Sequence, residues 1–160
     1  MTFADAISNS SLLTQAFKNG LQALSPADCQ HVVVDNTRQL AGSLNLEDAL
    51  RSSYPNPPIW DYGIGHRRAA HGEHTSDFVY WLEVHPATDG DIEPVLRKLT
   101  WLKSWLEKSA PALAKLPRQF VWVSSGKTAF TQRSPQAKRM AEQGLLHVGS
   151  HLRIKAVRTG

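Results

Sequence analysis

A chain of 160 residues is long enough for one domain with a sizeable core and leaves little room for a second domain. Its 41% hydrophobic and 20% charged residues are typical of a soluble globular protein and exclude an intrinsically disordered one. The formal net charge of +4 at pH 7 is compatible with a polyanionic partner but does not require one.

The cysteine content and the absence of long apolar runs predict a cytoplasmic protein. Cys29 is the single cysteine, so no disulfide can form within the chain and a reducing compartment is expected. The first 17 residues lack the basic and apolar regions of a signal peptide. No apolar run in the sequence is long enough to span a membrane, so no membrane partner is expected.

The first 40 residues are predicted to form a helical extension. Residues 10–24 are expected to be a short amphipathic helix, because apolar residues recur there at helical spacing. These residues are Leu13, Phe17, Leu21 and Leu24. Ser25 and Pro26 then resemble the start of a second helix, with a capping serine and a proline in the first turn. Residues 29–44 are ambiguous, since a β-branched run interrupts a helix-compatible segment.

A helical piece and a β-hairpin are predicted next. The helix in residues 44–53 ends at the proline-rich stretch 54–58. Two β-rich runs, 59–68 and 77–85, then flank a short polar loop that contains glycine, which is typical of a hairpin. If the turn centres near Gly72, Asp61 lies opposite Glu83.

The second strand of this hairpin carries two polar side chains on one face. Because side chains alternate along a strand, Glu83 and His85 point the same way, and the hairpin register brings Asp61 beside them. Two carboxylates at the ends of adjacent strands can hold Mg²⁺ or Mn²⁺ through oxygen ligands. The alternative is structural: Asp61 caps the hairpin and Glu83 lies on a half-solvated face of the sheet.

The remainder of the chain predicts a mixed α/β fold. Residues 92–109 carry a continuous apolar stripe and are expected to form a long helix. A linker at 111–118, a strand at 119–125 and a helix at 134–144 follow, and 145–157 form one or two further strands. The predicted architecture is one α/β domain over residues 1–160, with the helical extension at about 1–40 and a central mixed sheet flanked by helices in 41–160.

The order of these elements resembles the core of the PD-(D/E)XK nuclease superfamily. The resemblance covers about residues 40–125 and includes an aspartate on one hairpin strand and Glu83-Val84-His85 on the next. It implies a restriction-endonuclease-like core in which Asp61 is the metal-binding aspartate and Glu83 the second carboxylate. It also implies that His85 replaces the usual lysine, and that Glu47 is the helix-borne glutamate that some members add to the metal site.

The resemblance implies metal-dependent hydrolysis of phosphodiester bonds in DNA or RNA, with Mg²⁺ or Mn²⁺ as cofactor. Substrate phosphates would be met by basic residues near the hairpin, the long helix and the later strand. These residues are Arg67, Arg68, Lys98 and Lys127.

Two departures from the family pattern leave an alternative open. The proline that usually precedes the aspartate is absent at Trp60, and histidine stands at position 85 where lysine is usual. A histidine can act as acid or base near neutral pH, or another lysine, Lys98 or Lys127, could reach the site. The alternative function is an inactive nuclease-like scaffold that binds a protein partner or a second copy of the chain.

Two further polar stretches have both a functional and a structural interpretation. The hairpin loop carries Glu73 and three histidines, which could bind zinc or nickel, but a polar loop is favoured because no ligand spacing recurs. The three histidines are His66, His71 and His74. The stretch SSGKT at 124–128 lacks the first glycine of a phosphate-binding loop and is not interpreted as one.

The C-terminal end of the chain is basic. Its cationic and histidine residues are His147, His151, Arg153, Lys155 and Arg158. A solvated edge strand whose charges discourage aggregation is the favoured interpretation, and a nucleic-acid track is the alternative.

Overall fold

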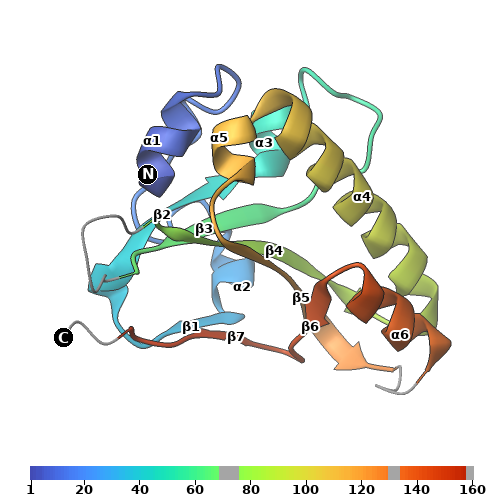
Figure 1. The fold of residues 1–160 in the computed structure, drawn as a ribbon. Helices are drawn as coiled ribbons and strands as arrows, with labels where there is room; N and C mark the ends of the chain where they lie inside the picture. Colours follow the sequence, from blue (N-terminus) through green and yellow to red (C-terminus); the bar gives the residue numbers. More distant parts are fainter. Residues whose placement is uncertain (69–75, 130–133, 158–160) are drawn as a thin grey trace.

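The computed structural model describes residues 1–68, 76–129 and 134–157 (Figure 1). The helices are α1 (Phe3–Ser8), α2 (Pro26–Cys29), α3 (Leu46–Leu50), α4 (Ile92–Ser109), α5 (Pro111–Ala114) and α6 (Pro135–Glu142), with the 3-10 turns η1 (Thr37–Gln39) and η2 (Asp89–Asp91). The strands are β1 (Val32–Val34), β2 (Leu40–Asn45), β3 (Tyr62–His66), β4 (Phe78–Ala87), β5 (Arg118–Thr128), β6 (Leu145–His147) and β7 (Leu152–Ile154).

Five strands form a central mixed sheet in the order β2-β3-β4-β5-β6. The pairs β2–β3 and β3–β4 are antiparallel, whereas β4–β5 and β5–β6 are parallel. Figure 1 shows α1, α3, α4 and α5 above this sheet, and α2 with the two-stranded parallel pair β1–β7 below it. The predicted α/β class, a central mixed sheet flanked by helices, is confirmed.

Each face of the central sheet covers its own apolar core. The core under α4 includes the fully buried Trp60, Trp81 and Leu99. The core between the sheet and β1–β7 includes Ile64 and Val121, which are also fully buried. A strand that is buried on both faces has a nearly continuous apolar sequence, which explains the composition of β4.

The predicted register of the hairpin is confirmed. Tyr62 pairs with Leu82 and Gly63 with Trp81, so Asp61, just before β3, lies opposite Glu83. The predicted alternation of β4 is also confirmed, since Trp81 belongs to the core under α4 and Leu82 to the core on the other face.

The later elements follow the sequence closely. α4 spans residues 92–109 as predicted, because its apolar stripe packs on the sheet. Ser134 caps α6 by accepting a hydrogen bond from the backbone N–H of Ala137 at 3.1 Å. Gly144 follows that helix with a φ of 75°, a conformation that glycine adopts at little cost. The last segment forms two strands, β6 and β7.

The predicted helix over residues 10–24 is wrong. The segment forms turns, and Lys18 pairs with Ser43 through two backbone hydrogen bonds of 2.8 and 3.0 Å. Leu13 joins the core under α4, whereas Leu24 joins the core beside β1–β7. Their helical spacing therefore reflects a segment that passes the edge of the sheet and supplies apolar side chains to both cores.

Other parts of the N-terminal region also differ from the expected helical extension. Its helices are the short α1 and α2, and the ambiguous stretch 29–44 contains β1 and most of β2. The segment 111–118, expected as a linker, contains α5. Phe3 is fully buried, so the first 40 residues are part of the packed structure. None of the helices in the described residues has the length and apolarity needed to cross a bilayer.

Gly65→Ala tests the packing of α1 on β3. A Cβ at this position would lie 2.5 Å from the ring of Phe3, which is fully buried and has no room to move aside. We expect the free energy of unfolding to fall by about 1–3 kcal/mol, the usual cost of overpacking. Urea denaturation measures this change. Gly126→Ala is the control, since nothing lies within 4 Å of a Cβ there. Equal stability of the two variants would contradict this packing.

Candidate carboxylate–lysine site

Three charged side chains from separate elements converge at one end of the hairpin. Asp61 precedes β3, Glu83 lies on β4, and Lys98 reaches down from α4. The Lys98 Nζ lies 2.6 Å from Glu83 Oε2 and 3.6 Å from Asp61 Oδ1. The lysine therefore bridges the two carboxylates, and we call these three residues the carboxylate–lysine site.

Backbone groups of the hairpin hold both carboxylates in place. The N–H of Asp61 donates to Glu83 Oε1 at 3.2 Å, and the N–H of Val84 donates to Asp61 Oδ2 at 3.0 Å. The Glu83 side chain is fully buried, whereas those of Asp61 and Lys98 are 23% and 22% exposed. The site therefore meets solvent through Asp61 and Lys98, with Glu83 behind them.

Burial perturbs the proton affinities of all three groups. Burial and, to a lesser extent, the negative charge of Asp61 raise the pKa of Glu83, Lys98 opposes both effects, and the net result is a pKa of about 8. Burial also raises the pKa of Asp61, again against the influence of Lys98. Burial lowers the pKa of Lys98, but the two carboxylates outweigh it and the net shift is upward. The raised pKa of Glu83 places the exchange of its proton near neutral pH.

The two carboxylates fit a divalent cation that needs few protein ligands. Both face the same ammonium group, at 2.6 and 3.6 Å, so their oxygens converge on one point. Within residues 1–68, 76–129 and 134–157, no group of three or more His, Cys, Asp and Glu side chains could hold a metal. Mg²⁺ commonly keeps several waters and uses one or two carboxylates, whereas a structural zinc needs four protein ligands. The donor set suits Mg²⁺ or Mn²⁺ better than zinc.

Glu47, the third predicted metal ligand, is paired elsewhere. Its carboxylate accepts hydrogen bonds from Arg51 Nε at 2.7 Å and Nη2 at 2.9 Å. Arg51 Nη1 also donates to carbonyl groups of the proline-rich stretch 54–58. Glu47 contributes to the raised pKa of Lys98 through its charge. To become a metal ligand, Glu47 would have to leave Arg51.

His85 contacts residues other than those of the carboxylate–lysine site. Its Nδ1 lies 2.9 Å from the carbonyl oxygen of Pro86 and 3.6 Å from Asp91 Oδ1, and its ring meets Trp122 edge-on. The cation beside Glu83 is instead Lys98, one of the two lysines that the sequence left as substitutes. The local pattern Glu-x-His therefore does not identify the group that contacts the glutamate.

The remaining predicted phosphate contacts are dispersed. Arg67 donates to the carbonyl of Arg38 at 3.3 Å, and Arg68 donates to the hydroxyl of Tyr80 on the face of the sheet away from α4. Lys127 is exposed near the end of β5. The structure therefore brings Lys98, but not these three residues, into the carboxylate–lysine site.

The loop histidines give no metal site in the described residues. His71, His74 and Glu73 lie outside those residues. His66 is buried on β3, and neither ring nitrogen has a hydrogen-bond partner among the residues described. Burial lowers the pKa of His66, which keeps the ring neutral.

A serine–histidine pair that the sequence did not connect lies near the end of β5. Ser124 Oγ lies 2.7 Å from His147 Nε2 and 2.8 Å from Thr128 Oγ1. His147 ends β6, and Ser124 lies two residues beyond its partner Trp122 on the neighbouring parallel strand β5, toward the edge of the sheet where the carboxyl ends of parallel strands meet. That rule could have paired them. Ser124 is only 1% exposed, so the pair is a buried polar contact and not an accessible nucleophile.

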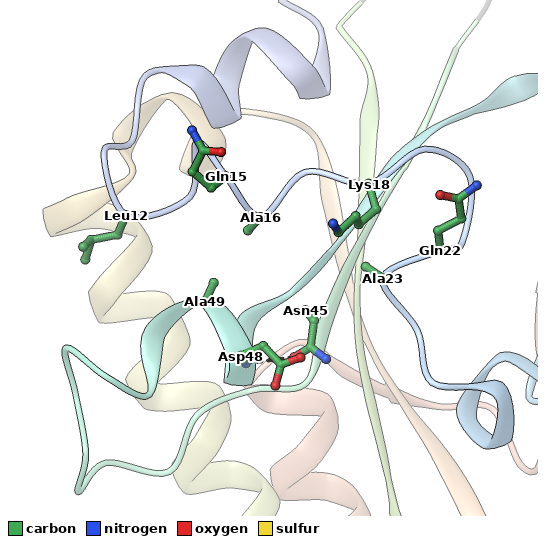
Figure 2. Close-up of a pocket in the computed structure, with 9 residues that line it drawn as sticks. All are labelled: Leu12, Gln15, Ala16, Lys18, Gln22, Ala23, Asn45, Asp48 and Ala49. Atoms are coloured by element: carbon green, nitrogen blue, oxygen red, sulfur yellow. Dashed lines mark hydrogen bonds between the residues drawn. The ribbon is translucent and has the colours of Figure 1, made fainter.

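A separate hollow of about 410 Å³ lies between the N-terminal segment and α3. Figure 2 shows side chains from residues 12–23 facing Asn45, Asp48 and Ala49 across it. Its charged lining consists of Lys18 and Asp48. None of the residues predicted to take part in catalysis lines this hollow, so it is distinct from the carboxylate–lysine site.

Glu83→Gln tests the raised proton affinity of the buried carboxyl group. Between its ordinary pKa of 4.5 and about 8, Glu83 holds a proton in the folded protein that the unfolded chain releases. The free energy of unfolding therefore falls as pH rises through this window, by up to about 1.4 kcal/mol per pH unit. We expect Glu83→Gln to lose this slope in urea titrations across the same pH range. Glu47 is exposed and pairs with Arg51, so Glu47→Gln is expected to keep this slope. Equal slopes in wild type and Glu83→Gln would contradict the assignment.

Comparisons of the chain with protein-family models, with curated proteins and with solved structures found no match. The chemistry of Asp61, Glu83 and Lys98 is therefore the basis on which a function can be inferred.

Proposed function

We propose that the carboxylate–lysine site catalyses Mg²⁺- or Mn²⁺-dependent hydrolysis of phosphodiester bonds in DNA or RNA. One observation carries the proposal: the fully buried carboxylate of Glu83 lies 2.6 Å from a lysine ammonium that also contacts the partly exposed Asp61. A buried carboxylate costs free energy, so its position beside a second carboxylate at a solvent-facing edge suggests a chemical role.

The three side chains have complementary tasks in this reaction. Asp61 and Glu83 would hold the cation, which supplies an activated water and stabilises negative charge on the phosphate. Lys98 would donate a hydrogen bond to a phosphate oxygen as charge develops there, the kind of preorganised stabilisation that often dominates catalysis. Because Lys98 is partly exposed, its ammonium can meet a substrate without leaving the site.

The position of Lys98 supports the resemblance to PD-(D/E)XK nucleases despite His85. In that resemblance a lysine two residues after the second carboxylate serves the reaction, and His85 occupies this position. Here an ammonium reaches the same carboxylate from α4, so the substitution at position 85 does not remove the cation. A restriction-endonuclease-like core is therefore part of the proposal.

The alternative is an inactive scaffold of the same fold that binds a protein partner or a second copy of the chain. The contacts of Lys98 favour it in one respect, because an ammonium already bridges both carboxylates. In that case the three residues would form an ion network that fastens α4 to the sheet. Metal binding separates the two functions.

Calorimetric titration of Mn²⁺ tests the proposed metal site. We expect wild type to bind Mn²⁺ and Glu83→Gln to bind it at least about tenfold more weakly, since a ligand charge is lost. Because Glu83 must release its proton, the affinity should rise about tenfold per pH unit below its pKa of about 8. Glu93→Gln, an exposed residue on α4 that pairs with Arg139, is the control and should bind as wild type does. Absence of Mn²⁺ binding to wild type would reject the metal site and favour the scaffold.

Lys98→Gln tests the catalytic role of the ammonium. We expect cleavage of labelled DNA and RNA oligonucleotides in Mn²⁺ to slow by about 10²–10³-fold, the usual effect of removing a donor that stabilises developing charge. Lys108→Gln removes an exposed lysine from the last turn of the same helix and should cleave at the wild-type rate. Cleavage by Lys98→Gln at the rate of this control would assign the lysine a structural role.

A further inference from the structure

A basic groove lies on the face of the central sheet away from the carboxylate–lysine site. It has a volume of about 630 Å³ and is lined by Tyr80 of β4, which belongs to the face opposite Glu83, and by residues of β7. Its cationic lining consists of Arg68, Arg153 and Lys155, joined by His151. None of the described residues that line the groove is acidic.

The groove unites basic residues from distant parts of the chain. Arg68 follows β3, whereas Arg153 and Lys155 belong to β7 and the residues after it. Figure 1 shows β7 paired with β1 below the central sheet, and this layer brings the C-terminal cations toward the face that carries Tyr80. In the sequence, Arg68 and the C-terminal cations are far apart and are interpreted separately, whereas the fold places them on one surface.

Aromatic contacts fix the orientation of Arg68. Its guanidinium carbon lies 4.3 Å from the centroid of the Phe78 ring, and its Nη2 donates to the hydroxyl of Tyr80 at 3.2 Å. A guanidinium held against a ring loses little further freedom when it binds an anion. Arg68 is therefore arranged in advance to meet a negative group in the groove.

The positive charge of the groove is only partly compensated. Arg153 Nε pairs with Asp35 Oδ1 at 3.1 Å, and this carboxylate does not line the groove. Lys155 is exposed and makes no ion pair with any residue in the described part of the chain. Asp35 also interacts electrostatically with Lys155, but one carboxylate does not balance two cations, so an anionic ligand would stabilise this arrangement.

Apart from Tyr80 and Gln119, the rest of the lining is apolar, and this restricts the class of ligand. Leu146 is 43% exposed, and Val148 and the buried Leu152 lie beside it. In proteins that bind single strands, bases stack on aromatic side chains while the phosphates meet cations, and the ring of Tyr80 offers such a surface beside these apolar side chains. A duplex hides its bases, and an acidic peptide or a small anion does not need an apolar floor.

We propose that this groove binds a single-stranded segment of DNA or RNA, with phosphates on Arg68, Arg153 and Lys155 and bases on the apolar floor. The proposal does not depend on catalysis, because the groove and the carboxylate–lysine site lie on opposite faces of the sheet. If the protein is a nuclease, the groove would hold a part of the strand away from the cleavage site.

Fluorescence anisotropy of a labelled oligothymidylate of about 12 nucleotides, in EDTA, tests the proposal. We expect the double variant Arg153→Gln/Lys155→Gln to bind at least about tenfold more weakly than wild type. The slope of log K against log salt should become shallower by about 1.4, since each phosphate contact on a single strand contributes about 0.7. The control Lys108→Gln/Lys138→Gln removes the same charge from exposed positions on α4 and α6 and should bind within about twofold of wild type.

Three results would overturn the proposal: no binding by wild type at low salt, equal loss in both double variants, or equally tight binding of a DNA duplex through the same residues. Equal loss would mean that net charge alone attracts the strand. Because EDTA removes divalent metal, Glu83→Gln should bind the oligonucleotide as wild type does. Absence of Mn²⁺ binding or of cleavage in wild type would therefore reject the nuclease proposal and leave the groove unaffected.

Discussion

The structure depends on a carboxylate that has no contact with water. Glu83 lies on β4, the middle strand of the central sheet, and an unpaired charge there would cost several kcal/mol. Its oxygens are satisfied by the ammonium of Lys98 and the backbone N–H of Asp61. These contacts require α4 to lie over one end of the hairpin and β3 to keep its register with β4. The same contacts thus fix both the position of the candidate site and the position of α4.

Elements whose signal is local could be predicted from the sequence. The hairpin register followed from the symmetry of two β-rich runs around a short loop, and it placed Asp61 opposite Glu83 correctly. α4 was predicted with its observed bounds because its apolar stripe packs on one surface over its whole length. The cap at Ser134 was also visible, because a capping side chain bonds within three residues of itself.

The parts that failed depend on contacts between distant residues. Residues 10–24 were expected as a helix, but a bridge from Lys18 to Ser43 directs the segment along the sheet edge. From the sequence alone, either His85 or a lysine from elsewhere in the chain could be the cation beside Glu83. No spacing along the chain reveals that residue 98, and not residue 127, meets residue 83, because this contact exists only once α4 has docked on the sheet.

The pairing of β1 with β7 has a consequence for how the protein is made. β1 ends at Val34, and its partner strand begins at Leu152, so a nascent chain on the ribosome exposes β1 until nearly all of these residues have emerged. During that time the apolar face of the sheet that includes Ile64 and Val121 has no cover from β7. Unpaired strand edges and uncovered apolar surface are the features that make folding intermediates aggregate. Chaperone demand during synthesis should therefore depend on when β7 emerges, well after the carboxylate–lysine site has been synthesised.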